Sequence, residues 1–164
     1  MICAILSDTH GPRFWKGCPP RVAEHLAGVD LILHAGDVCT VGVLRELETY
    51  APVRAVLGNN DGQDVAEWGA PEILEFEIDG RSVAMIHDSG QATGRMARMR
   101  MQFPAADLVV FGHSHIPWDE EAAGQRVYNP GSPTDKRRQP RGTIGMLEIE
   151  DRRIVSLETI PVTG

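Results

Sequence analysis

Short apolar runs that alternate with helical segments are the feature that most limits what this chain can fold into. Near the N-terminus such runs, expected to be buried strands, occupy residues 2–6, 31–34 and 53–57. Between them, Pro19-Pro20 opens one predicted helix, and Thr40 stands at the N-cap of a second. Strands joined through helices favour right-handed crossovers and therefore a parallel sheet.

The second half of the chain changes rhythm and predicts further strands. Apolar runs flank Asp79-Gly80 within residues 72–87, a pattern typical of a two-residue hairpin turn. A helix is expected over about residues 93–103, and strands at residues 108–111, 125–128, 143–150 and 152–160, the last two forming a hairpin. We therefore expect one domain, residues 1–164, with an α/β fold: a four-layer α/β/β/α sandwich of two mixed sheets flanked by helices.

Composition disfavours several classes of protein. The chain has 164 residues and a formal net charge of −7, whereas a protein that coats nucleic acid usually carries the opposite sign. No apolar segment approaches the roughly 20 residues that span a bilayer, so we expect no membrane association. The N-terminus lacks a secretory pattern, and the three cysteines lack CxxC spacing, so we expect a cytoplasmic protein with reduced thiols.

Candidate metal ligands follow the predicted strands, at the point where each strand ends. The segments SDTH, HAGD, GNND, IHD and GHSH supply seven candidate ligands from among Asp8, His10, Asp37, Asn59, Asn60, Asp61, His87, Asp88, His113 and His115. Ligands gather beyond the carboxyl ends of strands in α/β sheets, so these side chains are expected to meet at one edge. Oxygen and imidazole groups suit Mn²⁺, Fe²⁺, Ni²⁺ or Zn²⁺. Seven ligands are too many for one tetrahedral site and fit two ions that share a carboxylate.

The order of these segments is also informative. D-x-H, G-D, G-N-x-D, an isolated His and G-H-x-H follow one another along the chain. This order resembles the signature of the calcineurin-like metallophosphoesterase superfamily. The short chain and the segment NPGSPTDKRRQPR, residues 129–141, resemble its small prokaryotic phosphodiesterase branch. The resemblance implies a double β-sheet sandwich flanked by helices, in agreement with the strand pattern.

The same resemblance implies how the ligands are shared. They fall into two groups with a bridge between them: Asp8, His10 and His115; Asn59, His87 and His113; and Asp37 as the bridge. We expect two divalent ions. Mn²⁺ is the metal expected first, with Ni²⁺, Fe²⁺ and Zn²⁺ as the alternatives. A hydroxide that bridges the ions would attack phosphorus in line, while Asp37 fixes their separation.

Position 60 departs from the family pattern. Many members have a histidine there that can protonate the leaving oxygen, whereas the amide of Asn60 donates a hydrogen bond but cannot act as a general acid. We expect Asn60 to bind substrate and to act in catalysis with Asp37 and Asp61, although Asp61 equally fits a supporting role or an exposed turn. Without the histidine, phosphodiesters with acidic leaving groups, such as aryl esters, should react best.

The basic run TDKRRQPR, residues 134–141, is a further candidate for substrate contact. Arg137 and Arg138 are expected to contact phosphate, with a solvated loop as the alternative. Upstream of this run, Asn129 and Ser132 are expected to shape a turn near the metal cleft. His34, inside a predicted strand, fits a core position better than a ligand.

These features lead to one functional hypothesis and two alternatives. The hypothesis is a metal-dependent phosphodiesterase that acts on a small phosphodiester. One alternative is a non-catalytic protein-interaction scaffold on the same fold, although such scaffolds typically lose ligands and all seven positions are filled here. The other is a phosphomonoesterase or nucleotidase. A homo-oligomer is compatible with the sequence.

Overall fold

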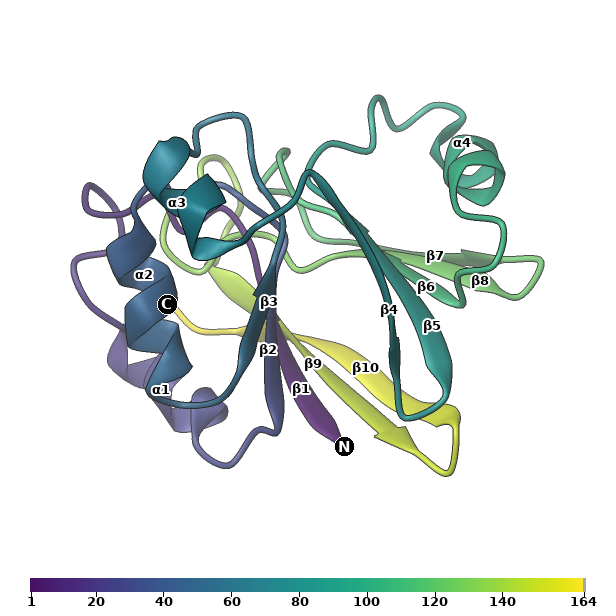
Figure 1. The fold of residues 1–164 in the computed structure, drawn as a ribbon, viewed down its shortest axis with the longest axis horizontal. Helices are drawn as coiled ribbons and strands as arrows, with labels where there is room; N and C mark the ends of the chain where they lie inside the picture. The colour runs from purple at the N-terminus through teal and green to yellow at the C-terminus, as the bar shows by residue number, and fades with distance from the viewer. Residues whose placement is uncertain (164) are drawn as a thin grey trace.

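The structure, a computed structural model, describes residues 1–163 and forms two five-stranded sheets (Figure 1). The first sheet has the order β10-β9-β1-β2-β3 and the second has the order β4-β5-β6-β8-β7. The strands of the first sheet are β1 (Ile2–Leu6), β2 (Leu31–His34), β3 (Val53–Ala55), β9 (Thr143–Glu150) and β10 (Arg153–Pro161). Those of the second are β4 (Ile73–Ile78), β5 (Arg81–Ile86), β6 (Leu108–Val110), β7 (Trp118–Ala122) and β8 (Gln125–Asn129).

Helices form the two outer layers of the molecule. They are α1 (Pro20–Leu26), α2 (Val41–Glu48), α3 (Gln63–Trp68) and α4 (Arg95–Gln102). Helices α1 and α2 lie outside the first sheet and α4 lies outside the second (Figure 1). One apolar cluster, which includes Leu44, joins the helices to the first sheet; another, which includes Ile5, fills the space between the sheets; a third, which includes Met99, holds α4. The expected four-layer sandwich is confirmed.

Parallel pairing brings strand ends to a common edge of each sheet. β1 is parallel to β2, and β2 to β3. In the second sheet, β5, β6 and β8 run parallel to one another. Hydrogen bonds join the segments that follow these strands: the amide of His113, after β6, donates to Asp8, after β1, and His87, after β5, contacts the carbonyl of Ala35, after β2. The two edges therefore meet in one place.

Most expected elements are present, and the differences have local causes. The turn at Asp79-Gly80 joins β4 to β5, and β9 pairs with β10 in a hairpin, as predicted. The third strand ends at Ala55, two residues earlier than expected, because the amide of Leu57 donates to the carbonyl of Pro71 and not to β2. Two elements were not predicted. Helix α3 has six residues with one buried side chain, and β7 is an acidic edge strand whose side chains are mostly exposed. Among residues 1–163, no helix is long and apolar enough to cross a membrane.

Candidate metal centre

The seven predicted ligands converge where the two sheet edges meet. The loops after β1 and β2 run side by side, because the amide of Asp8 donates to the carbonyl of Gly36 and the amide of His10 donates to that of Asp37. The loop after β6 joins them through a hydrogen bond of 3.0 Å from the amide of His113 to Asp8 Oδ2. Residues more than 100 positions apart in the sequence thus become neighbours.

The backbone of this region adopts an uncommon conformation. A positive φ is unusual for residues other than glycine, and it is found at five of the seven predicted ligands: Asp8 (56°), His10 (47°), Asp37 (59°), His113 (73°) and His115 (62°). Such conformations carry a free-energy cost of about 1–3 kcal/mol each and persist where the surrounding structure enforces them. Their concentration at one edge indicates that the chain is held in place to present these side chains.

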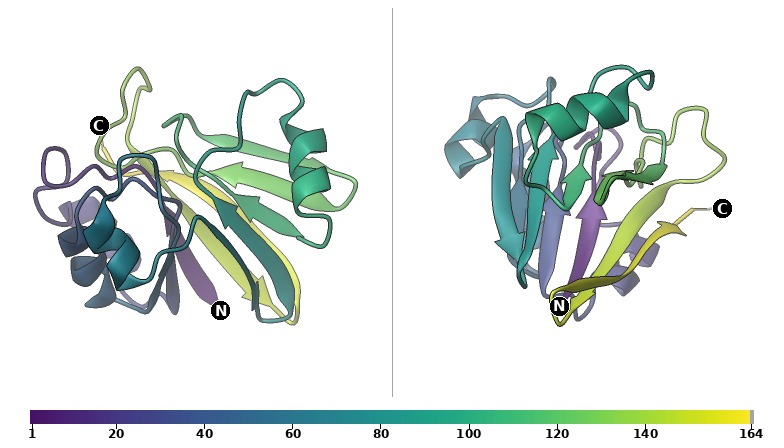
Figure 2. Two further views of the ribbon diagram at one scale, coloured as in Figure 1. Left: turned by 45° about the horizontal axis from the view of Figure 1, so that its top comes forward. Right: turned by 90° about the vertical axis from the view of Figure 1, so that its right-hand side faces the viewer.

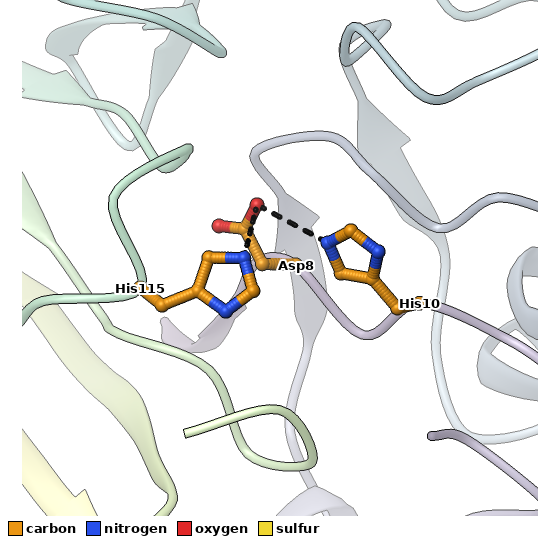
Figure 3. A group of neighbouring side chains, drawn as sticks. All are labelled: Asp8, His10 and His115. Carbon is orange, nitrogen blue, oxygen red and sulfur yellow. Dashed lines mark ion pairs between the residues drawn. The ribbon is translucent and has the colours of Figure 1, made fainter. Parts of the chain in front are cut away.

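The first group of ligand atoms surrounds one oxygen of Asp8. Asp8 Oδ1 lies 3.5 Å from His115 Nε2 and 3.9 Å from His10 Nε2, and both rings turn these nitrogens toward it (Figure 3). All three atoms are buried, and none has a hydrogen-bond partner in the part of the chain that the structure describes. Buried polar atoms are almost always satisfied, so three unsatisfied atoms that face one another fit a cation between them.

Hydrogen bonds on the far side of these residues leave the facing atoms free. Asp8 Oδ2 accepts a hydrogen bond from Ser7 Oγ at 2.6 Å and another from the amide of His113 at 3.0 Å. Oδ1 therefore remains free to bind a cation. His115 Nδ1 donates to the carbonyl of Asp135, which leaves Nε2 with its lone pair. Neutral imidazole that donates through one nitrogen and offers the other is the arrangement found in metal sites.

The second group surrounds the side-chain oxygen of Asn59. This Oδ1 atom lies 3.0 Å from His87 Nε2 and 3.1 Å from His113 Nδ1. His87 Nδ1 lies 2.7 Å from the carbonyl of Ala35, so that nitrogen carries the hydrogen and Nε2 presents its lone pair to Asn59 when the ring is neutral. Two lone pairs at this distance repel, so this contact becomes favourable when a proton or a metal ion lies between the two atoms.

Asp37 lies between the two groups. Its Oδ2 atom is 3.5 Å from His10 Nε2, which belongs to the first group, and 3.3 Å from His87 Nε2, which belongs to the second. Burial lowers the pKa of His87, but the contact with Asp37 and the charge of Asp8 outweigh it and raise the pKa to about 9. A metal ion that binds here would displace that proton, because both cations respond to the same carboxylates.

Asn60 and Asp61 hold Asp37 in position. The backbone amide of Asn60 donates to Asp37 Oδ1 and its side-chain amide donates to Oδ2, each at 2.8 Å. Burial raises the pKa of Asp37, but its contact with His87 and these hydrogen bonds prevail and hold the pKa well below its usual range. Asp61 accepts from the backbone amides of Asp37, Cys39 and Gly58, so both of its oxygens are engaged in shaping the loops.

Two glycines permit the close approach of the ligand loops. A Cβ atom at position 58 would overlap the carboxylate and the backbone nitrogen of Asp37. A Cβ atom at position 112 would overlap Ser7 Oγ and lie 2.7 Å from Asp8 Oδ2. The glycines that precede Asn59 and His113 therefore leave the space that Asp37 and Asp8 occupy.

Other predicted residues fall around the centre. Ser132 Oγ donates to the carbonyl of Asp8, and Asn129 Nδ2 donates to the carbonyl of Gly112, so the predicted turn does support the site. His34 is buried; the amide of Gly36 donates to its Nδ1 atom, and burial lowers its pKa to about 4, which keeps the ring neutral.

The basic run does not enter the two ligand groups. Arg137 and Arg138 are exposed and line a separate pocket with Ser114 and Ile116, next to the segment that holds His115. The structure does not bring either guanidinium among the clustered ligands, and the role of both residues in phosphate binding stays a prediction.

Sequence reasoning missed several residues that support the ligands. Ser7 and the carbonyls of Ala35 and Asp135 fix the carboxylate or imidazole they contact. Cys39, which we expected only to be a reduced thiol, places Sγ 3.5 Å from His10 Nδ1. Ser7 could have been suspected because it directly precedes Asp8, but backbone carbonyls leave no signal in the sequence.

Comparisons with known proteins agree with this fold and site. The family model described as "Calcineurin-like phosphoesterase superfamily domain" matches residues 1–152. A probable metallophosphoesterase of Methanothermobacter thermautotrophicus is 37% identical over 140 residues, which are 84% of this chain and 80% of the relative. The chain therefore belongs to the calcineurin-like phosphoesterase superfamily, whose members are hydrolases that use divalent metals.

Two further matches refine the comparison. A phosphodiesterase of Methanocaldococcus jannaschii is 30% identical over 144 residues, which are 80% of this chain and 83% of the relative. The crystal structure of Vps29 from Entamoeba histolytica in complex with Zn²⁺ has a TM-score of 0.79 and covers 99% of each chain at 22% identity. At that identity the structural match supports the fold alone. The small prokaryotic branch inferred from the sequence is confirmed by the curated relatives.

Proposed function

We propose that this chain is a phosphodiesterase that works with two divalent metal ions, Mn²⁺ before Ni²⁺, Fe²⁺ or Zn²⁺. The observation that carries the proposal is the cluster of three buried and unsatisfied atoms around Asp8 Oδ1, together with the contacts of Asp37 Oδ2 to a histidine of each group. Asp8, His10 and His115 would hold one ion, and Asn59, His87 and His113 the other. Asp37 would bridge them.

The reaction then divides between the metals and the chain. Bound divalent ions supply an activated water and neutralise charge on the phosphoryl oxygens. Asp37 fixes the relation between the two ligand groups, and Asn60 orients Asp37 through two hydrogen bonds. We assign Asp61, first predicted to be catalytic, to positioning, because backbone amides occupy both of its oxygens.

Asn60 determines which leaving groups are favoured. Its side-chain amide can donate a hydrogen bond to the departing oxygen but cannot give up a proton at neutral pH. An aryl oxide leaves without protonation more readily than an alkoxide does. The preference expected from the proposal is therefore for aryl phosphodiesters over alkyl ones, and the M. jannaschii phosphodiesterase supports a diester over a monoester substrate.

The proposal is tested by hydrolysis before and after metal removal. The protein is treated with a chelator and dialysed. It is then assayed with bis(p-nitrophenyl) phosphate, with p-nitrophenyl phosphate and with a dialkyl phosphate, first without metal and then with each ion. We expect no turnover without metal, recovery with Mn²⁺, and faster hydrolysis of the aryl diester than of either other substrate. Equal rates on alkyl and aryl diesters would refute the role of Asn60. A faster monoester reaction would favour the phosphomonoesterase alternative, and no turnover with any ion would favour the scaffold.

A further inference from the structure

We propose that two pockets beside the metal centre sort the ester groups of the substrate by charge: an anionic substituent binds on one side and an uncharged aryl leaving group on the other. This inference rests on the proposed phosphodiesterase function and adds the class of substrate. It predicts an asymmetric phosphodiester with an additional carboxylate or phosphate on the ester group that is retained.

The first pocket, here called the acidic pocket, opens beside the second ligand group, which consists of Asn59, His87 and His113. Asn59 and His87 line it, and its apolar surface comes from Leu57, Ile73 and Ile86. Glu72 and Asp88 also line this pocket, and its lining contains no lysine or arginine within the described residues. Ile73 is 43% exposed, so its side chain is available for contact with a bound group. Such a surface fits a flat uncharged group and repels an anion.

The second pocket, here called the basic pocket, opens beside the first ligand group, which consists of Asp8, His10 and His115. Ser114, which lies between the two histidines of the GHSH motif, forms one side of it with Ile116. Lys136, Arg137, Arg138 and Gln139 also line it, and the lining is mainly apolar. The three cations follow directly after Asp135, whose carbonyl binds His115. Lys136 Nζ donates to the carbonyl of Gln139, while Arg137 and Arg138 are exposed. Figure 2 shows the connection between β8 and β9, which carries this run, extending away from the body of the molecule.

The position of Asn60 assigns the leaving group to the acidic pocket. In the proposed function Asn60 donates a hydrogen bond to the leaving oxygen, and its neighbours Asn59 and Asp61 both line that pocket. The retained ester group then extends past the first ligand group toward the basic pocket. Arginine binds carboxylate and phosphate through paired hydrogen bonds, so an anionic substituent there gains affinity. In a chain with a net charge of −7, the three successive cations at positions 136–138 make the basic pocket locally positive.

The test uses diesters that share the p-nitrophenyl leaving group and differ by one charge. The Mn²⁺-loaded protein is assayed with p-nitrophenyl p-carboxyphenyl phosphate and with its uncharged match, p-nitrophenyl p-carbamoylphenyl phosphate. We expect kcat/KM to be about fivefold higher for the carboxylate, as one partly exposed ion pair allows. In the double variant Arg137→Gln/Arg138→Gln the ratio should fall to about one. Arg153→Gln, an exposed arginine at the start of β10, is the control and should keep the ratio.

A second pair of substrates tests the acidic pocket. Here the carboxylate or the carboxamide is placed on the nitrophenyl leaving group, and the retained group is phenyl. The carboxylate should now lower kcat/KM about fivefold, and Glu72→Gln should relieve part of that loss. Ratios near one for both pairs in the wild-type protein would overturn the inference. So would an unchanged ratio in the Arg137→Gln/Arg138→Gln variant with both substrates slowed equally, because the arginines would then contact the scissile phosphate.

A binding measurement separates this inference from the proposed function. p-Carboxyphenyl phosphonate and p-carbamoylphenyl phosphonate are titrated into the Mn²⁺-loaded protein by calorimetry. Tighter binding of the carboxylate, lost in the arginine double variant, supports the basic pocket even if no diester is hydrolysed, in which case the proposed function alone fails. Equal affinities together with diester hydrolysis would refute the charge sorting and leave the phosphodiesterase proposal standing.

Discussion

Replacement of Asp37 by Asn should lower kcat for bis(p-nitrophenyl) phosphate by about a thousandfold or more. The carboxylate contacts a histidine of each ligand group, and an amide of the same shape keeps the fold but removes the negative charge that two cations would share. Metal ions contribute several kcal/mol to phosphoryl transfer, and a loss of about 4 kcal/mol corresponds to about a thousandfold in rate. Turnover and metal content per chain are measured on the same preparation.

Asp151→Asn is the matched control for this substitution. Asp151 is an exposed carboxylate in the turn between β9 and β10, and its φ of 51° is one that asparagine tolerates well. The control should keep both turnover and metal. If Asp37→Asn kept kcat within about tenfold of the wild-type value and bound as much metal, Asp37 would not be the bridge. A scaffold would show no turnover in either variant.

Replacement of Gly112 by Ala should destabilise the chain and empty the first ligand group. The added methyl group would overlap Ser7 Oγ, whose hydroxyl donates to Asp8 Oδ2, and it would press on that oxygen directly. Overpacking of a well-packed site costs about 1–3 kcal/mol, and here the displaced side chain is the central carboxylate. We therefore expect a lower midpoint of urea unfolding and a metal content reduced by at least one ion.

Gly42→Ala separates this effect from a general intolerance of alanine. Gly42 lies in α2, where the nearest atom to an added Cβ would be Thr40 Oγ1 at 3.9 Å. Alanine in a helix is favoured over glycine by about 1 kcal/mol, so this variant should be at least as stable as the wild type. A Gly112→Ala protein with wild-type stability and wild-type metal content would show that the close approach of the β1 and β6 loops is not needed.

The sequence predicts the four layers and most of the strands, and it places the candidate ligands at the ends of strands. Asp8, Asp37 and His113 could be found because each follows a buried strand, and the carboxyl ends of parallel strands meet at one edge. The turn at Asp79-Gly80 could be predicted because an Asp-Gly pair between two apolar runs is typical of a two-residue hairpin turn. Both inferences depend on local features that the chain carries within a few residues.

The parts that sequence reasoning missed depend on contacts between distant segments. Helix α3 has six residues and a single buried side chain, so its sequence lacks the repeating apolar positions that predict a helix. Strand β7, WDEEA, is acidic and is held at the sheet edge by pairing with β8, including the ion pair between Asp119 and Arg126. The role of Asp61 follows from three backbone amides in two loops, which become neighbours only after folding.

The most direct test of the account is the anomalous scattering of a crystal grown with excess Mn²⁺. We expect two manganese ions: one bound by Asp8, His10 and His115, and one bound by Asn59, His87 and His113. The carboxylate of Asp37 should contact both ions. A single peak would reduce the centre to one ion and remove the bridging role of Asp37. No peak among these residues, with manganese bound elsewhere or not at all, would contradict the central claim that this edge of the two sheets is a metal centre.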